Sequence, residues 1–326
     1  PDEDLFLEFK REDGTGAVGS GFGQPGYWQE TVSADVDWKV NKNTLPHILE
    51  YDPETDTFEL RPGNWQDRLV GTDTSNPPPS FIDAQITAVT TFQSRLVFLS
   101  GSYVCMSRTN KYEDFWMGSA ANLVDSDPID ISSTAVEASV MEEVVPHNRD
   151  LVIFSKKGQF VVFGRSALTP ANATLVLTTA FEAALSAKPV PSGRNVFFAT
   201  NYGRFTGIRE FFTESNTDIN DTRPITQNIK EYIIGTAKNM AASSNYDILL
   251  VNTDKSNHSL YPYQYIWTDT EKIQSAWSRW DFSDNVEFFF FDEEMVYMVM
   301  SHPASGPTAY YLIRMSLDIT PEPGTN

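Results

Sequence analysis

The sequence has few cysteines, few basic residues and no long apolar run. Its 326 residues include one cysteine, Cys105, so no disulfide can form within the chain. No apolar stretch reaches the ~18 residues that a membrane-spanning helix needs, which predicts no membrane insertion. The chain starts without Met, and its acidic residues 1–4 are unlike a secretory signal. We therefore expect a piece of a longer polypeptide.

The shortage of basic residues leaves a formal net charge of −20, from 24 Lys and Arg against 44 Asp and Glu. A protein that holds duplex DNA displaces the phosphate counterions with Lys and Arg. This balance is the opposite one, and the sequence has no run of basic residues, so stable nucleic-acid binding is disfavoured. An acidic surface keeps a protein soluble. It would also suit a wall that repels DNA.

Signatures of catalysis and of metal binding are scarce too. The histidines His47, His147, His258 and His302 have no second histidine or cysteine at ligand spacing. No G-x-S-x-G motif is present. Residues 14–19 match G-x-G-x-x-G, but the glycine-rich sequence that follows cannot form the helix that holds a pyrophosphate. We interpret this motif as a loop and predict no catalytic, cofactor-binding or metal-binding residues.

Two further patterns have a functional and a structural interpretation. Oxygen-rich acidic clusters suit hard cations such as calcium, but Asp and Asn are also ordinary turn residues, which we favour. The stretch 277–281 carries two tryptophans and could form a carbohydrate platform, although its alternation fits a strand packed on both faces. The acidic clusters are Asp52, Glu54 and Asp56; Asp125, Asp127 and Asp130; and Asp218, Asn220 and Asp221.

Aromatic residues and short apolar runs are what the sequence has in abundance. Aromatics make up 13% and hydrophobic residues 40% of the chain, which suffices for a sizeable core and favours strands. Short helices are predicted only at 180–187 and 228–233. Five apolar runs recur at intervals of 55, 45, 52 and 47 residues between their first apolar positions. The runs are 95–99, 150–154, 195–199, 247–251 and 294–298.

A repeat of about 50 residues predicts an all-β fold built from the four-stranded blades of a β-propeller. Each run is followed by a second strand-like segment, and its unbroken apolar character suits a strand covered on both faces. A β-sandwich or another β fold remains open. We predict a small β-rich N-terminal lobe or partial blade over 1–80, with a hairpin at 45–61. A β-propeller domain over 81–319 follows, and then a C-terminal linker or tail over 320–326.

Several stretches, in this order along the chain, resemble the nozzle proteins (tail tubular protein B) of short-tailed bacteriophages. Together they extend over roughly residues 45–318. The segments are Asn76–Ile82, Ser94–Gly101, Ser107–Tyr112, Ala120–Asp130, Gly193–Ala199 and Trp277–Phe282.

The resemblance implies a structural protein of the phage tail. Its relatives form a hexameric tube below the portal and the adaptor (upper tail tubular) protein, are built around a β-propeller, contact the tail fibres and let the genome leave. They are about twice as long as this chain, and they offer no catalytic residues to carry over. We therefore expect a virion tail component that is not an enzyme, with DNA only passing through an acidic channel.

Two other classes of function stay open from the sequence alone. One is a propeller-fold glycosidase or lyase that acts on bacterial surface polysaccharide, since one fold hosts many activities. Carboxylates that converge at a separation of ~5–10 Å would indicate it. The other is an interaction scaffold unrelated to phages.

Overall fold

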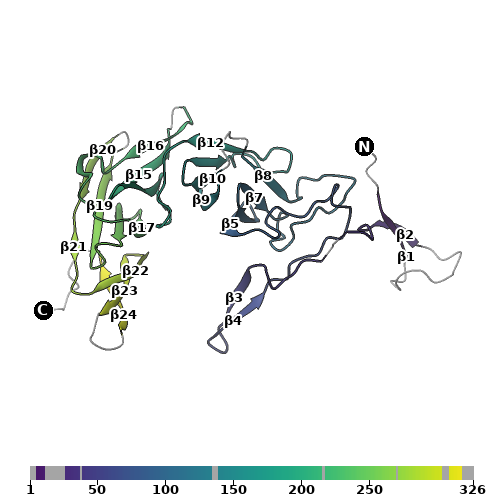
Figure 1. Cartoon of the computed structure of the whole chain (residues 1–326), viewed down its shortest axis with the longest axis horizontal. Coiled ribbons are helices and arrows are strands. Elements are labelled where there is room, and N and C mark those ends of the chain that lie inside the picture. Colours follow the sequence, from purple (N-terminus) through teal and green to yellow (C-terminus); the bar gives the residue numbers. More distant parts are fainter. Residues whose placement is uncertain are drawn as a thin grey trace. The chain divides into compact units, whose positions relative to one another are not determined.

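The computed structural model describes residues 5–11, 26–36, 39–133, 139–214, 217–268, 271–302 and 308–317. These ranges are all-β, and their helical content is the 3₁₀ turn η1 (Gln227–Ile229) (Figure 1). The chain divides into two compact units, unit 1 (Pro1–Met141 and Val162–Leu175) and unit 2 (Glu142–Val161 and Val176–Asn326). The boundaries expected at 80 and 319 stay predictions. The motif at 14–19 and the tail at 320–326 lie outside the described residues.

The 50-residue repeat corresponds to five consecutive sheets. In each sheet the strand order follows the chain, and the pairings in the sheets that begin with β5, β13, β17 and β22 are antiparallel. The first four sheets are β5 (Ile86–Phe92), β6 (Arg95–Ser100), β7 (Tyr103–Met106) and β8 (Ile129–Ser132); β9 (Met141–His147), β10 (Asp150–Ser155), β11 (Gln159–Val162) and β12 (Leu175–Thr179); β13 (Val190–Ser192), β14 (Asn195–Tyr202), β15 (Phe205–Thr213) and β16 (Asn220–Pro224); and β17 (Ala237–Ser243), β18 (Ile248–Thr253), β19 (Ser259–Trp267) and β20 (Lys272–Trp277), with β21 (Trp280–Asp281) also on β19. The fifth contains β22 (Asn285–Asp292), β23 (Met295–His302) and β24 (Ala309–Ser316). Each predicted apolar run forms the second strand of its sheet.

Tight turns fix the register of these meanders. Several neighbouring strands are separated by only two residues, and the first of the two has a left-handed backbone, as at Gly101, Gly193 and Gly203. Asn148 takes the same role between β9 and β10, with φ 55°. Such turns match the right-handed twist of the strands, and Gly and Asn adopt them at least cost. The sequence therefore dictates hairpins at these positions.

The fourth sheet is covered on both faces. All six residues of β18 are buried. Leu249 and Tyr263 of this sheet pack with Phe197 of the third sheet in one apolar cluster. On the opposite face, Leu250 packs with Phe289 of the fifth sheet in another cluster. This double coverage explains the unbroken apolar run that the sequence shows.

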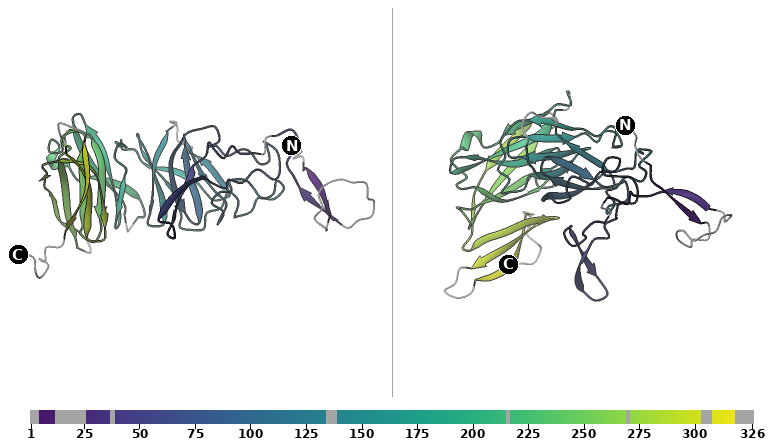
Figure 2. Two further views of the ribbon diagram at one scale, coloured as in Figure 1. Left: turned by 90° about the horizontal axis from the view of Figure 1, so that it is seen from below. Right: turned by 45° about the vertical axis from the view of Figure 1, so that its right-hand side comes forward.

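In addition to its four-stranded sheet, unit 1 contains two separate two-stranded ribbons. The predicted hairpin is β3 (His47–Asp52) and β4 (Thr57–Pro62), and the second ribbon is β1 (Leu7–Arg11) and β2 (Gly26–Glu30) (Figure 2). The core of this unit contains Leu45, Trp65, Phe81, Phe98 and Phe115. Its rings meet edge-on, tilted or stacked, as in the stacked contact between Phe98 and Phe115 with centroids 5.1 Å apart.

The helix predicted at 180–187 is wrong. This segment contains only irregular structure and turns, and Ala183, Ala184 and Ala187 are buried in it. Ala184 N donates to the carbonyl of Ala199 in β14. The alanines are small because the backbone runs close to a neighbouring strand, so their high helix propensity is overridden by packing. The second predicted helix is limited to η1.

Candidate interaction surfaces

A buried arginine orders the long connection between β7 and β8, residues 107–128. The guanidinium of Arg95 on β6 is 1% exposed. It donates to the carbonyls of Ser107 at 2.7 Å, Asp127 at 2.6 Å, Asp125 at 2.8 Å and Leu168 at 3.3 Å. Burial lowers the pKa of Arg95, and the charge of Asp127 opposes that change. These bonds hold the start and the end of the connection together.

Asp127 organises the middle of the same connection. It is fully buried, and its two oxygens accept hydrogen bonds from Gly118 N at 3.1 Å and Val124 N at 2.9 Å. Arg108 Nε lies 3.6 Å from Asp127, and Arg108 Nη1 lies 3.3 Å from Asp114. The carboxylate is therefore occupied by backbone donors and an arginine. The acidic cluster at 125–130 serves loop structure here.

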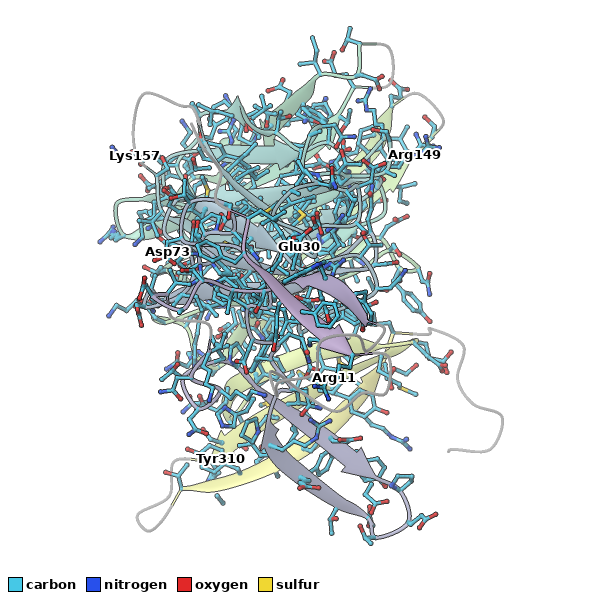
Figure 3. All side chains as sticks on the ribbon, turned by 90° about the vertical axis from the view of Figure 1, so that its right-hand side faces the viewer. Arg11, Glu30, Asp73, Arg149, Lys157 and Tyr310 are labelled. Atoms are coloured by element: carbon cyan, nitrogen blue, oxygen red, sulfur yellow. The ribbon has the colours of Figure 1, made fainter. Side chains whose placement is uncertain are left out.

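Two distant residues complete this polar framework. Asn76 is 1% exposed; its Nδ2 donates to Val70 O, and its Oδ1 accepts from Met117 N. Glu30, at the end of β2, accepts from Ser119 Oγ at 2.7 Å and from Ala120 N at 2.8 Å (Figure 3). Sequence reasoning did not identify these contacts. Asn76 does fall within a segment that carries the resemblance.

A half-open groove of about 860 Å³ lies beside this connection in unit 1. Its lining is mainly apolar and includes Leu69, Val89, Phe98 and Trp116. The lining also includes the cationic residues Arg108 and Lys111.

The carboxylates of the groove are already engaged. Asp67 Oδ1 accepts from Val40 N at 3.0 Å, and Glu113 Oε1 accepts from Asn64 N at 2.9 Å. The third, Asp114, pairs with Arg108. The groove thus suits apolar packing better than acid–base chemistry, which needs carboxylates that face a substrate.

The fifth sheet has one face that the described residues leave uncovered. Phe288, Phe290 and Leu312 are exposed on it, and the rings of Phe290 and Tyr297 stack with centroids 5.3 Å apart. Tyr310, at the start of β24, is also exposed (Figure 3). Large apolar patches of this kind usually mark an interaction surface.

A buried ion pair links the third and fourth sheets. Lys272 Nζ of β20 lies 2.7 Å from Glu210 Oε2 of β15, and the two side chains are 10% and 1% exposed. Asn195 Nδ2 donates to the other oxygen of Glu210. The ammonium also lies near the rings of Tyr263, Tyr265 and Trp267. Burial lowers the pKa of Lys272, and Glu210 opposes this.

The histidines do not converge. His147 is buried, its Nε2 lies 3.0 Å from Arg194 O, and burial lowers its pKa. His302 Nδ1 lies 2.6 Å from Asp284 Oδ1, and Tyr311 donates to the other oxygen of that carboxylate. Both bonds lower the pKa of Asp284. Within the described ranges, no three His, Cys, Asp or Glu side chains gather as metal ligands would. The absence of a metal site stays a prediction.

The remaining candidates serve turns and packing. Asp52 accepts from Glu54 N and Thr55 Oγ1 in the β3–β4 turn, as expected of turn chemistry. Asp218 has a left-handed backbone with φ 57°, two residues before β16. Trp277 packs against the cluster between the third and fourth sheets, and Trp280 packs against the next one. Neither forms an exposed carbohydrate platform.

Comparison with known proteins identifies the class. The model of the bacteriophage nozzle protein family matches residues 3–323. The all-β chain therefore belongs to the bacteriophage nozzle protein family, which confirms the resemblance seen in the sequence. It is a structural component of the virion tail.

The most informative relative is the tail tubular protein gp12 of Escherichia phage T7. It is 31% identical over 261 residues, which is 80% of this chain and 33% of that protein. The chain thus spans about a third of the length of the curated relative it matches.

Solved structures add nothing to this assignment. Hsv2 of Kluyveromyces lactis aligns with a TM-score of 0.43 and 7% identity over 78% of this chain and 65% of that one. PorZ of Porphyromonas gingivalis aligns with a TM-score of 0.37 and 11% identity over 72% and 28%. TM-scores this low do not support a shared fold.

In the described ranges no helix is long and apolar enough to cross a membrane.

Proposed function

We propose that this chain forms part of the wall of the tail tube through which the genome leaves the particle. In this proposal the full-length protein assembles as a hexamer, beneath the adaptor protein and in contact with the tail fibres. Family membership supports the location in the tail, and the arrangement of the sheets and the charge support the role in the wall.

The arrangement of first strands is the observation that carries the proposal. In unit 2 the first strands β13, β17 and β22 of three consecutive sheets lie beside one another. Asn239 Nδ2 of β17 donates to Phe289 O of β22 at 3.1 Å, and Lys238 of β17 pairs with Glu287 of β22 at 3.0 Å. Consecutive meanders whose first strands lie side by side are typical of propeller blades around an axis. We infer a β-propeller that gives the tube wall a stiff building block.

The charge supports passage of DNA without binding. A chain with 44 acidic against 24 basic residues repels a phosphate backbone and offers few cations to replace its counterions. The genome can then slide past the wall. We infer a role without catalysis, because the carboxylates of the groove are committed to loop contacts.

Cryo-electron microscopy of the full-length protein, mixed with the adaptor protein and tail fibre of the same phage, tests the assembly. The expected result is a six-fold tube with an acidic lumen. A protein that stays monomeric with both partners present would contradict the proposal.

Retention of DNA tests the passage. Purified chain at low salt should not shift linear duplex DNA, and a basic protein of similar size serves as the positive control. Tight retention by this chain would overturn the sliding role while leaving its place in the tail intact.

A further inference from the structure

One face of the β3–β4 hairpin of unit 1 carries four large apolar side chains, beyond the pair His47 and Pro62 at its base. Leu49 pairs with Leu60 and Tyr51 with Phe58 across the two strands. These side chains are 64%, 67%, 49% and 69% exposed, and the rings of Tyr51 and Phe58 lie 5.1 Å apart. The ribbon extends away from the β5–β8 sheet of its unit (Figures 1 and 2). Four such side chains in adjacent pairs form a contiguous apolar strip, which water disfavours.

The hairpin is anchored at both ends. Leu45, just before β3, and Trp65, just after β4, are buried in the core of unit 1. Trp65 Nε1 donates to Pro46 O at 3.3 Å, which ties the two ends together. On the polar face, Arg61 pairs with Glu50 at 3.0 Å. The strip is therefore held on a fixed base, which lowers the entropy lost when a partner binds.

An isolated two-stranded hairpin is only marginally stable in water. Nothing in the described part of unit 1 covers the strip, since all four of its large side chains remain about half exposed or more. A covering partner would both stabilise the ribbon and remove the strip from water.

The charge of the hairpin indicates the chemistry of that partner. Residues 47–62 contain five carboxylates against one arginine, and that arginine is already paired with Glu50. Hydrogen bonds from Glu54 N and Thr55 Oγ1 lower the pKa of Asp52, which favours its ionised form. A matching surface must offer cations around an apolar centre, because like charges at an interface repel. A second copy with a net charge of −20 fits this poorly.

We propose that the β3–β4 hairpin is a docking arm for a different tail protein, whose apolar cleft is bordered by lysine and arginine. The apolar strip fills the cleft, and the carboxylates of the turn and the polar face meet the basic border. This inference rests on the proposed function, because it assumes that the chain stands among other proteins in the tail. It adds the surface of contact and the chemistry of the partner.

Photo-crosslinking in assembled virions tests the contact directly. The full-length protein carries Phe58→p-benzoylphenylalanine, and the matched control carries the same residue at Glu59 on the opposite face. After irradiation, mass spectrometry should identify an adduct at position 58 with another tail protein, next to lysine or arginine residues. The position 59 variant should give much less of it. An adduct with a second copy or with the same chain, or no adduct at all, overturns the proposal.

A loss-of-contact experiment gives an independent measurement. Phe58→Ser with Leu60→Ser should reduce the amount of the crosslinked partner retained on purified tails at least about tenfold, as expected for central apolar contacts. Ile273→Ser, at a comparably exposed aliphatic residue of β20, should leave it unchanged. The Asp52→Asn, Glu54→Gln and Asp56→Asn triple variant should release the partner at lower salt than the wild type does. Equal retention by all variants would refute the arm.

The two proposals fail in different ways. If the chain is absent from the tail tube, the proposed function fails. If the tube forms normally and the hairpin variants keep every partner, only the docking arm fails.

Discussion

The second strands of the fourth and fifth sheets differ although their sequences look alike. Both are apolar runs, Ile248–Thr253 and Met295–His302. Every residue of β18 is buried, whereas Met295–Met300 of β23 alternate between half-buried and buried positions. The fourth sheet packs against a neighbour on each face, whereas the described residues cover the fifth sheet on one face. An apolar run thus specifies a strand, while its coverage depends on what stands beside the sheet.

The ion pairs on the two sides of the fourth sheet also differ in how far they are exposed to solvent. Between the third and fourth sheets, the Lys272–Glu210 pair is almost entirely buried. Between the fourth and fifth sheets, the side chains of the paired Lys238 and Glu287 are 41% and 35% exposed. Removing the same chemical group at each place should therefore have very different consequences.

Lys272→Met should give the largest effect. Met replaces the stem of the lysine but leaves Glu210 charged in a buried site, where a lone charge is strongly disfavoured. We expect a loss of about 3–5 kcal/mol in the free energy of unfolding, measured by urea denaturation. The double variant Lys272→Met/Glu210→Gln should recover part of that loss.

Lys238→Met is the matched control on the more exposed pair. It should cost only about 0.2–1 kcal/mol, because solvent screens both charges. Equal losses in unfolding free energy for the two lysine variants would mean that burial does not determine how much each ion pair contributes to stability.

Leu249→Ala and Leu312→Ala compare the two sheets by packing alone. Leu249 is fully buried between the third and fourth sheets, so its truncation should cost about 2–5 kcal/mol through lost burial and the cavity left behind. Leu312 lies on the uncovered face of β24 and is 62% exposed, so its variant should lose less than about 1 kcal/mol. Thermal unfolding of the two variants side by side measures the difference. A large loss for Leu312→Ala would show that its face is covered.

The strands were predictable because their signals are local. Each predicted apolar run forms a strand, and the hairpin at 45–61 follows from the turn residues between its two apolar segments. Gly and Asn at two-residue turns fix where the meanders reverse. The helix predicted at 180–187 failed for a nonlocal reason, since close packing on β14 selected its alanines.

The polar framework of unit 1 could not be predicted from the sequence. Arg95 binds carbonyls up to 73 positions away, and Glu30 binds Ser119, which is 89 positions away. No spacing rule relates such residues, because the chain path between them decides whether they meet. The uncovered faces escaped prediction too, since coverage belongs to the neighbours of a sheet.

Alkaline pH tests the packing between the third and fourth sheets through the ionisation of two buried tyrosines. Burial raises the pKa of Tyr263 and of Tyr265 to about 12. Because the folded pKa values lie above the usual value of ~10, their contribution to stability is complete below pH ~10 and is lost as the pH rises towards 12. Tyrosinate absorbance should show a group of tyrosines that ionise late and together with unfolding. Tyr265→Phe should remove one tyrosine from that late phase, and an unchanged late amplitude would contradict the assignment.

Phe58→Thr should have the smallest effect of all. Thr keeps the strand propensity of position 58, and the ring it replaces is 69% exposed on the hairpin face. The ring is already mostly exposed in the folded chain, so unfolding exposes little further apolar area. We therefore expect the free energy of unfolding to change by less than about 0.5 kcal/mol. The measurement is chemical denaturation of the isolated chain, with Phe98→Thr in the core of unit 1 as the destabilised reference. A loss of several kcal/mol for Phe58→Thr would mean that the strip is already covered within the chain. That outcome would remove the reason for the hairpin to bind another protein, whereas a negligible loss keeps the strip available for one.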